Sequence, residues 1–427
     1  MKKLLLLVVI IGYIQALPAQ DFGKVKNLVL LPNQQEAAKT EIDKLMNDPK
    51  AQAKPEGWLF KSRVYAALYA DDKLRAKYPG SEVVSDDAFQ KYVKMDPTYK
   101  LLKEYGFQTI AGDMYGTSFN QGVSNYNNKN WDSSAYYFSF AVKYSDLIFQ
   151  NKWGRDTTMT LDTTSVLYTG IAYEKANKKD DAAIYYGRIA DSKIAKIGGN
   201  DMTDVYKWLA DHYTQKKDND KAMHYLELGW QVFPTDLYWP DMELDMARKS
   251  GNKDTLFARY DAVIKRIPDN HLFYYNYGLE LYQYATDTTT GARPANSADL
   301  VTKAQGLLNK SLSIKPDYPQ ASLVLGQISY NAGVDLQQQT KTIKGTKPED
   351  VKKRADLRVQ AGKKFDEAIP YLEKVDQDLA SKGKLKMEEK SALKDAYDLL
   401  ITIYEQKNVK DKSDLYTNKY NNVDKDH

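Results

Sequence analysis

The sequence contains no cysteine and only four histidines in 427 residues. Without cysteine, the chain cannot form disulfides, thiolate metal sites or a lipid anchor attached to a cysteine behind a leader. Paired acidic residues do occur, but they lie among lysines or at predicted helix starts, as is typical of solvated helix faces. We therefore predict no catalytic site, no metal and no cofactor.

Two segments are candidate exceptions. His212 and His224 fall on opposite helices of one predicted helix pair, with Asp211 and Glu227 nearby, and are the best metal-site candidate. Zinc-ligand spacing is missing, so exposed or packing histidines are favoured. Residues 198–201, Gly-Gly-Asn-Asp, could bind an anion at a helix start. A turn followed by an N-cap is favoured, because no strand is expected before it and no phosphate-loop lysine follows.

Charge of one sign is also scarce, with 61 basic and 57 acidic residues interspersed along the chain. The sequence shows no basic stripe of the kind that neutralises phosphates, so nucleic acid is not an expected partner. A hydrophobic content of 42% is enough to bury a core. Tyrosine is frequent, at 33 residues against 12 phenylalanines, which favours many half-buried aromatic positions.

The one long apolar run lies near the start of the sequence. Lys2 and Lys3 precede residues 4–11, which are all apolar, and Pro18 and Ala19 precede a polar segment. This order is typical of a secretory signal peptide, which we expect to be cleaved after Ala19. The alternative, a transmembrane anchor, is disfavoured because the run is shorter than the ~20 residues needed to span a bilayer. We expect a periplasmic or secreted protein of a Gram-negative bacterium, with no membrane span after removal of the leader.

A repeat of 34 residues emerges from spacing in the middle of the chain. Its best copy has large, small and aromatic residues at fixed offsets and ends in a proline that recurs 34 residues later, at Tyr206, Leu209, Ala210, Tyr213, Ala222, Leu226, Pro234 and then Pro268. Small residues let two antiparallel helices approach closely, and aromatic residues fill the space beside them. Earlier copies centre on Gly122 and Gly170, and later copies on Gly278 and Gly326.

Insertions interrupt the repeat without changing its phase. The second helix of the Gly278 copy returns at Ala304 and Leu308 after an extra loop, and that of the Gly326 copy at Phe365 and Leu372 after a charged insert, which we interpret as extended helix broken near residues 345–348. Residues 34–46, 58–69 and 86–95 predict divergent N-terminal helices, and residues 392–406 and 410–420 predict capping helices. Residues 154–164 predict a small turn or hairpin.

These offsets resemble the tetratricopeptide repeat (TPR) family over residues 113–420. The resemblance implies an all-α, right-handed superhelical solenoid of antiparallel helix pairs, with first helices lining a concave groove that binds proteins or peptides. It gives three segments: a signal peptide (1–19), divergent helical repeats (20–112) and a TPR solenoid with capping helices (113–427). We expect a non-enzymatic scaffold for envelope proteins or peptides. The alternative is a module that binds glycans or peptidoglycan fragments through Tyr and Trp. The sequence also resembles the helical carbohydrate-binding lipoproteins, but this resemblance is weakened because the chain has no cysteine to carry a lipid.

The phase of the repeat also predicts which side chains face the groove. The candidates are Tyr126, Lys207, Asp211, Asp241, Asp245, Arg248, Tyr275, Tyr282, Gln327 and Tyr330. Tyr275 and Tyr282 follow Asp241 and Arg248 by one period, which predicts an aromatic step beside a charged one. Lys374 falls on a second helix, where its removal is expected to be nearly neutral.

The tripeptide Asp-Thr-Thr occurs at Asp156, Asp162 and Asp287. It resembles a short acceptor sequence for O-glycosylation in some exported bacterial proteins. Turn formation by Asp and Thr is the favoured interpretation.

Overall fold

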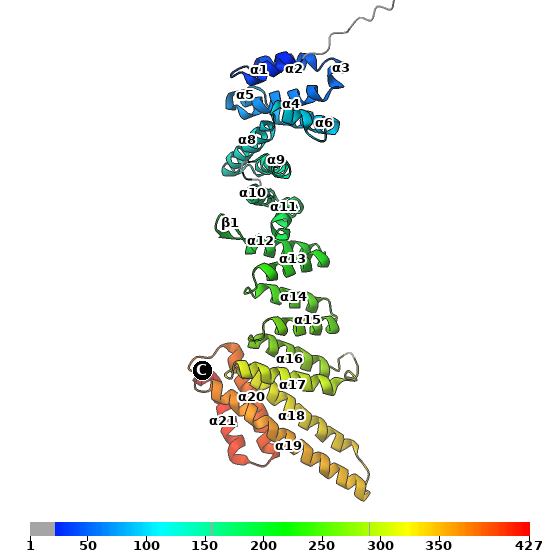
Figure 1. Cartoon of the computed structure of the whole chain (residues 1–427). Coiled ribbons are helices and arrows are strands. Elements are labelled where there is room, and N and C mark those ends of the chain that lie inside the picture. Colours follow the sequence, from blue (N-terminus) through cyan, green and yellow to red (C-terminus); the bar gives the residue numbers. More distant parts are fainter. Residues whose placement is uncertain (1–21, 155, 157, 290) are drawn as a thin grey trace, which may run out of the picture. The chain divides into compact units, whose positions relative to one another are not determined.

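The structure is a computed structural model that describes residues 22–427 except 155, 157 and 290, so the predicted signal peptide lies outside the described residues. The chain divides into two compact units, the first ending at Trp239 and the second running from Pro240 to His427. Within the described residues, helices form all the regular structure apart from one short strand pair. No helix in this part of the chain is long and apolar enough to cross a membrane. The predicted all-α class is confirmed (Figure 1).

The first unit contains a divergent N-terminal part followed by helix pairs. Its helices are α1 (Gly23–Leu30), α2 (Gln35–Leu45), α3 (Pro49–Gln52), α4 (Pro55–Ala70), α5 (Asp72–Lys77), α6 (Ser81–Met95), α7 (Lys100–Tyr105), α8 (Thr109–Asn127), α9 (Trp131–Gln150), α10 (Thr163–Lys175), α11 (Lys179–Asp191), α12 (Thr203–Gln215) and α13 (Asn219–Val232). The three predicted N-terminal helices are confirmed by α2, α4 and α6. The predicted boundaries between the three segments stay predictions, and residue 113 falls inside α8.

The second unit continues the pattern with longer helices. Helix α14 (Tyr238–Lys249) begins at the end of the first unit, and the rest are α15 (Lys253–Arg266), α16 (His271–Thr286), α17 (Ser297–Ile314), α18 (Pro319–Thr342), α19 (Pro348–Leu379), α20 (Met387–Gln406) and α21 (Lys410–Asp426). The charged insert forms the extended ends of α18 and α19, as the sequence predicts. Helices α20 and α21 confirm the predicted terminal pair.

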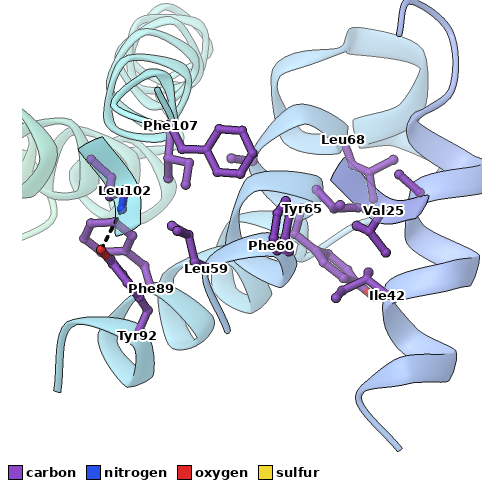
Figure 2. Close-up of a cluster of buried hydrophobic side chains, with 14 of the residues drawn as sticks. Val25, Ile42, Leu59, Phe60, Tyr65, Leu68, Phe89, Tyr92, Leu102 and Phe107 are labelled. Carbon is purple, nitrogen blue, oxygen red and sulfur yellow. Dashed lines mark hydrogen bonds between the residues drawn. The ribbon is translucent and has the colours of Figure 1, made fainter. Parts of the chain in front are cut away.

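The core of the N-terminal part is built around α4. Its Leu59 and Phe60 are fully buried, between Val25 and Ile42 on one side and Phe89 of α6 on the other (Figure 2). A buried backbone amide in this core is also satisfied by a side chain, because Leu102 N–H donates to the Tyr92 hydroxyl at 3.0 Å. The divergent region therefore has an apolar core, which continues into α8 and α9 through Met114 and Tyr144.

Close helix contacts follow the small-against-large rule that the spacing predicts. A Cβ atom added at Gly122 would lie 2.5 Å from the Phe138 ring, and one at Gly170 would lie 2.6 Å from Tyr186. In the second unit, the same contact joins Gly326 to Leu372 at 2.6 Å. Such distances are shorter than carbon atoms tolerate, so only glycine allows these helices to approach. The helix pairs are accordingly TPR-like.

Five of the turns inside the helix pairs contain a residue in the left-handed conformation. Residue Lys217, between α12 and α13, has φ +59°, and the next amide, of Asp218, bonds back to the Tyr213 carbonyl at 2.9 Å. This is the Schellman closure of a helix C-terminus. The Asp218 side chain then caps α13 by accepting from Lys221 N–H at 3.2 Å. Left-handed residues occupy the same place at Lys129, Asn177, Gly251 and Asn408.

The strand pair lies elsewhere than predicted. Strands β1 (Lys196–Ile197) and β2 (Asn200–Asp201) are antiparallel, joined by Gly198 and Gly199 with φ +57° and +84°. Two left-handed glycines favour a two-residue hairpin, so a strand does precede the helix start at this point, contrary to expectation. The described residues of 154–164 contain no strand.

The Asp-Thr-Thr segments form turns and caps. Asp156 and Asp287 each accept a hydrogen bond from the backbone of the threonine two positions on, both at 2.8 Å. Asp162 caps α10 by accepting from Ser165 N–H at 3.1 Å. This is the turn chemistry that the sequence favours.

Candidate functional site

In the second unit, successive first helices contact one another and form a continuous surface, here called the first-helix surface and made of α14, α16, α18 and α20. Three polar contacts join its members. Arg248 of α14 pairs with Glu280 of α16 at 2.7 Å, Asn331 of α18 donates to the Tyr282 hydroxyl of α16 at 2.7 Å, and Gln337 of α18 donates to Gln406 of α20 at 2.9 Å.

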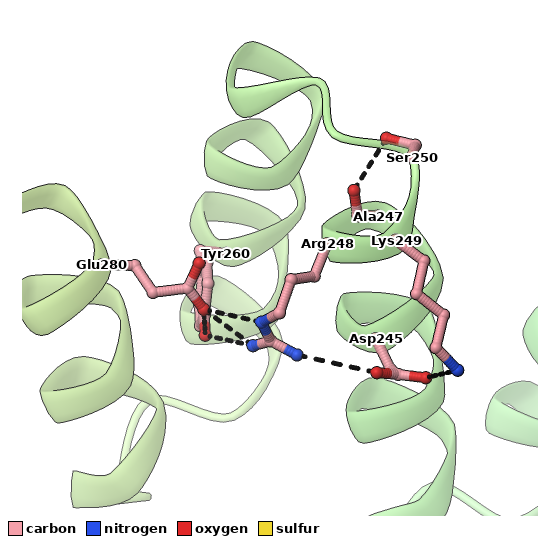
Figure 3. Close-up of polar contacts among 7 residues, drawn as sticks. All are labelled: Asp245, Ala247, Arg248, Lys249, Ser250, Tyr260 and Glu280. Carbon is pink, nitrogen blue, oxygen red and sulfur yellow. Dashed lines mark hydrogen bonds and ion pairs between the residues drawn. The ribbon is translucent and has the colours of Figure 1, made fainter. Parts of the chain in front are cut away.

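Arg248 is the centre of the first of these contacts (Figure 3). Its guanidinium donates to Glu280 through two nitrogens, at 2.7 and 3.0 Å, and to the Tyr260 hydroxyl at 3.1 Å. The Tyr260 hydroxyl in turn donates to Glu280 at 2.9 Å. Burial and the neighbouring Glu280 carboxylate raise the pKa of Tyr260, so its hydroxyl stays protonated and keeps this role as a donor. Asp245, one of three acidic candidates, pairs with Lys249 at 2.6 Å.

The predicted aromatic step is present but half-buried. The Tyr275 ring meets the Tyr318 ring edge-on, with centroids 5.1 Å apart, and both Tyr275 and Tyr282 pack against the core around Leu308 and Leu325. Tyr330 lies against Phe365 with centroids 5.5 Å apart. These tyrosines therefore join the helices as well as shape the surface, and truncating them removes packing.

Two further candidate residues lie on the same helices. Asp241 is exposed in the first turn of α14, and Gln327 is half-buried on α18. The first-helix surface thus combines tyrosine edges, amides and the exposed carboxylate of Asp241, while Arg248 and Asp245 are paired within the chain.

The candidates of the first unit make analogous contacts. Lys207 of α12 pairs with Asp236 at 2.6 Å and lies over the Tyr238 ring at 5.0 Å. The Tyr238 hydroxyl donates to Asp211 at 2.6 Å. Tyr126 lies farther toward the N-terminus, packed edge-on against Trp131. Lys207 and Asp211 are thus brought together through Asp236 and Tyr238.

The two histidines bind different carboxylates. Nε2 of His212 lies 3.2 Å from Asp180, and Nε2 of His224 lies 3.1 Å from Asp191. His212 also stacks on Trp208, and burial lowers its pKa. Among the described residues, no group of three or more His, Cys, Asp or Glu side chains is placed to hold a metal ion.

A cleft that the sequence analysis missed lies between α17, α18 and α19. Its volume is about 720 Å³, and its lining includes Gln305, Leu312, Ser322, Ser329, Tyr371 and Lys374. We call it the serine cleft. The signal was present in the sequence, because Ser322 and Ser329 stand four residues before and three after Gly326, where the best repeat has Tyr206 and Tyr213 around Ala210.

The cleft corrects the expectation for Lys374. This side chain lines the cleft and pairs with Asp378, whose side chain is only 9% exposed and whose Oδ2 atom has no hydrogen-bond partner. Removing Lys374 leaves a buried carboxylate without its cation, so the substitution is not a neutral control.

Comparisons with known proteins add little to this geometry. No family model and no curated protein match the chain. Among solved structures, the P58(IPK) TPR domain is 11% identical over 88% of this chain and 96% of that one, with a TM-score of 0.25. The Cut9–Hcn1 assembly of the APC/C is 11% identical over 94% and 86%, with a TM-score of 0.21. The human IFIT1 dimer with PPP-AAAA is 12% identical over 94% and 95%, with a TM-score of 0.20. Such low TM-scores carry no argument about function.

Proposed function

We propose that the protein is a non-enzymatic scaffold that binds partner proteins or peptides on its first-helix surface. One observation carries the proposal. Asp241 and Arg248 on α14, and Tyr275 and Tyr282 one period later on α16, occupy equivalent positions on helices that contact each other. Helices satisfy their own backbone groups, so such a surface recognises partners through side chains. Interfaces of this kind are rich in Tyr and Arg.

The proposal extends to the location of the partner. The apolar leader at residues 4–11 supports export, so we propose that the partners are proteins or peptides of a bacterial cell envelope, met in the periplasm. The second candidate function is binding of glycan or peptidoglycan fragments. The exposed carboxylate of Asp241 and the amide of Gln327, on helices of a surface that also carries tyrosines, favour it, because sugars are recognised by such groups. The packing of Tyr275 on Tyr318 disfavours it, because that ring is engaged within the protein.

The test is a pull-down from the envelope fraction with the mature protein and three variants. Asp241→Lys reverses an exposed charge without removing packing. The double variant Tyr275→Ala, Tyr282→Ala removes the aromatic step. Tyr420→Ala, at a tyrosine that is 38% exposed on α21, is the matched control.

A partner that is retained by the wild type and the control, and lost from both test variants, supports the proposal. Thermal melts show whether the double variant is folded, and Asp241→Lys stays informative if it is not. A partner kept by Asp241→Lys and by a folded double variant refutes binding at this surface. Displacement of the partner by soluble peptidoglycan fragments would favour the glycan alternative.

A further inference from the structure

We propose that the serine cleft binds the phenol ring of a tyrosine in a segment of a partner protein. This inference is independent of the first-helix surface. Ser322 and Ser329 are seven residues apart and share one side of α18, whereas Gln327 lies about 140° around the helix from Ser322 at 100° per residue. The two surfaces can therefore be tested separately.

Two core positions of α18 carry smaller side chains than the same positions of α12 and α16. Around the small residue of the first helix, the fourth and eleventh repeat positions hold Tyr206 and Tyr213 in α12, and Tyr274 and Leu281 in α16. Tyr206, Tyr274 and Leu281 are buried there. Helix α18 has serine at both positions, and both serines are among the residues that line a cleft of about 720 Å³.

The hydroxyl of one of these serines is unsatisfied. Ser322 lines the cleft, its side chain is 0% exposed, and its Oγ atom has no hydrogen-bond partner. A buried hydroxyl without a partner costs about 1–3 kcal/mol, and such groups are rare in folded proteins. A ligand hydroxyl that reaches Ser322 would remove this cost.

The chain itself shows which group suits a serine at this position. Ser118 holds the fourth position in the Gly122 repeat and is also 0% exposed. Its hydroxyl is paired with the Tyr69 hydroxyl at 3.1 Å, and the Tyr69 ring is fully buried. A tyrosine from a neighbouring helix thus fills the space and completes the hydrogen bond. Ser322 holds the same repeat position, but no described side chain is hydrogen-bonded to it, although Tyr371 of α19 also lines the cleft.

The remaining lining suits a tyrosine within a peptide better than a free phenol. Leu312 and Pro370 provide apolar contacts for the ring. Gln305, Glu367 and Lys374 provide donors and acceptors around it for the backbone of a flanking segment. The volume also exceeds that of a single ring, which leaves room for residues on either side.

The experiment uses methyl NMR of the full chain with labelled leucines. The probes are 4-methylphenol and toluene, which share a shape and differ by the hydroxyl, and the reporter is the Leu312 methyl pair. We expect 4-methylphenol to shift Leu312 and to bind about threefold to tenfold more tightly than toluene, the range of one net hydrogen bond. No shift of Leu312, or equal affinity for the two probes, would overturn the proposal.

Two substitutions locate the site. Ser329→Leu supplies the side chain that α16 has at this position and should abolish binding, while Ser313→Leu, exposed on α17, should leave it intact. Ser322→Ala removes only the hydroxyl and should erase the preference for 4-methylphenol even if Ser329→Leu fails to fold. Binding that survives Ser329→Leu in a folded protein, or a preference that survives Ser322→Ala, would contradict the assignment.

A last pair of probes identifies the source of the ring. N-acetyl-Gly-Tyr-Gly-amide should bind at least as tightly as 4-methylphenol, and its Phe analogue should bind more weakly. If 4-methylphenol binds and the tyrosine peptide does not, the cleft takes a free small phenol, and the proposal of a protein segment is wrong.

Discussion

Gly278 lies at the contact between α16 and α17, and replacing it with leucine tests the phase of the whole repeat. A Cβ atom there would lie 2.9 Å from Leu308 Cγ and 3.1 Å from the Ala304 carbonyl oxygen. Leu308 is fully buried and the carbonyl belongs to a helix, so neither can move away freely. Leucine adds three more carbons beyond Cβ. We expect overpacking to cost about 1–3 kcal/mol.

Helix propensity acts in the opposite direction. Leucine is favoured over glycine inside a helix by somewhat less than about 1 kcal/mol. The net effect should therefore be a loss of up to about 2 kcal/mol in the free energy of unfolding. The matched control is Gly306→Ala on α17, where an added Cβ meets nothing within 4 Å. That change should stabilise the helix by about 0.5–1 kcal/mol.

Hydrogen exchange is the assay, because it reports on α16 and α17 directly. All six tryptophans lie at or before Trp239, so tryptophan fluorescence reports on the first unit and serves as an internal reference. Exchange protection of α16 and α17 should fall by up to about thirtyfold in Gly278→Leu. If protection rises instead, as it should in Gly306→Ala, Gly278 is not at a tight helix contact and the phase is wrong.

Three further predictions concern single positions. Lys374→Ala should lower stability by about 1–3 kcal/mol in thermal melts, because the Asp378 carboxylate loses its cation, and adding Asp378→Ala should restore part of the loss. Lys217→Gly should raise stability by up to about 1 kcal/mol, because Lys217 has φ +59°, whereas Lys221→Gly, within α13, should lower it; urea unfolding followed by tryptophan fluorescence compares the two. Burial lowers the pKa of His212, so the folded state binds a proton at this residue less readily than the unfolded chain does. Neutral His212 therefore contributes to stability above about pH 6.5, and this contribution is lost as the pH falls through the folded pKa. Melts at pH 7.5 and 5.5 should show a smaller acid loss for His212→Gln than for the wild type, and equal losses would contradict this role.

Spacing predicted the helix contacts because the small residue of the first helix and the large residue of the second helix hold fixed positions within their own helices. Gly278 with Ala304 and Leu308, and Gly326 with Leu372, are found together as expected, despite insertions between the helices. The short helices α3, α5 and α7 were not predicted, because four to six residues contain too few turns to show a helical period.

Partners across repeats could not be predicted in the same way. The phase shows that Arg248 lies on the first-helix side, but Glu280 and Tyr260 reach it from two other helices. The contacts of Arg248 with these two residues depend on the angle between repeats, which no local sequence pattern specifies. Asn331 and Gln406 were missed for the same reason.

The departures from the repeat are more informative about ligands than its regular positions. A small residue at a core position leaves a gap, and the atoms that line the gap lose dispersion contacts unless another side chain fills it. The Gly122 repeat compensates Ser118 within the chain by Tyr69, with the two hydroxyls paired at 3.1 Å. The Gly326 repeat carries two such serines, and no described side chain completes the hydrogen bond of Ser322; its cleft is also lined by Tyr371 and by Lys374, whose own partner Asp378 is buried. Since one solution to this packing problem is already present in the chain, a tyrosine supplied from outside requires no new chemistry at Ser322.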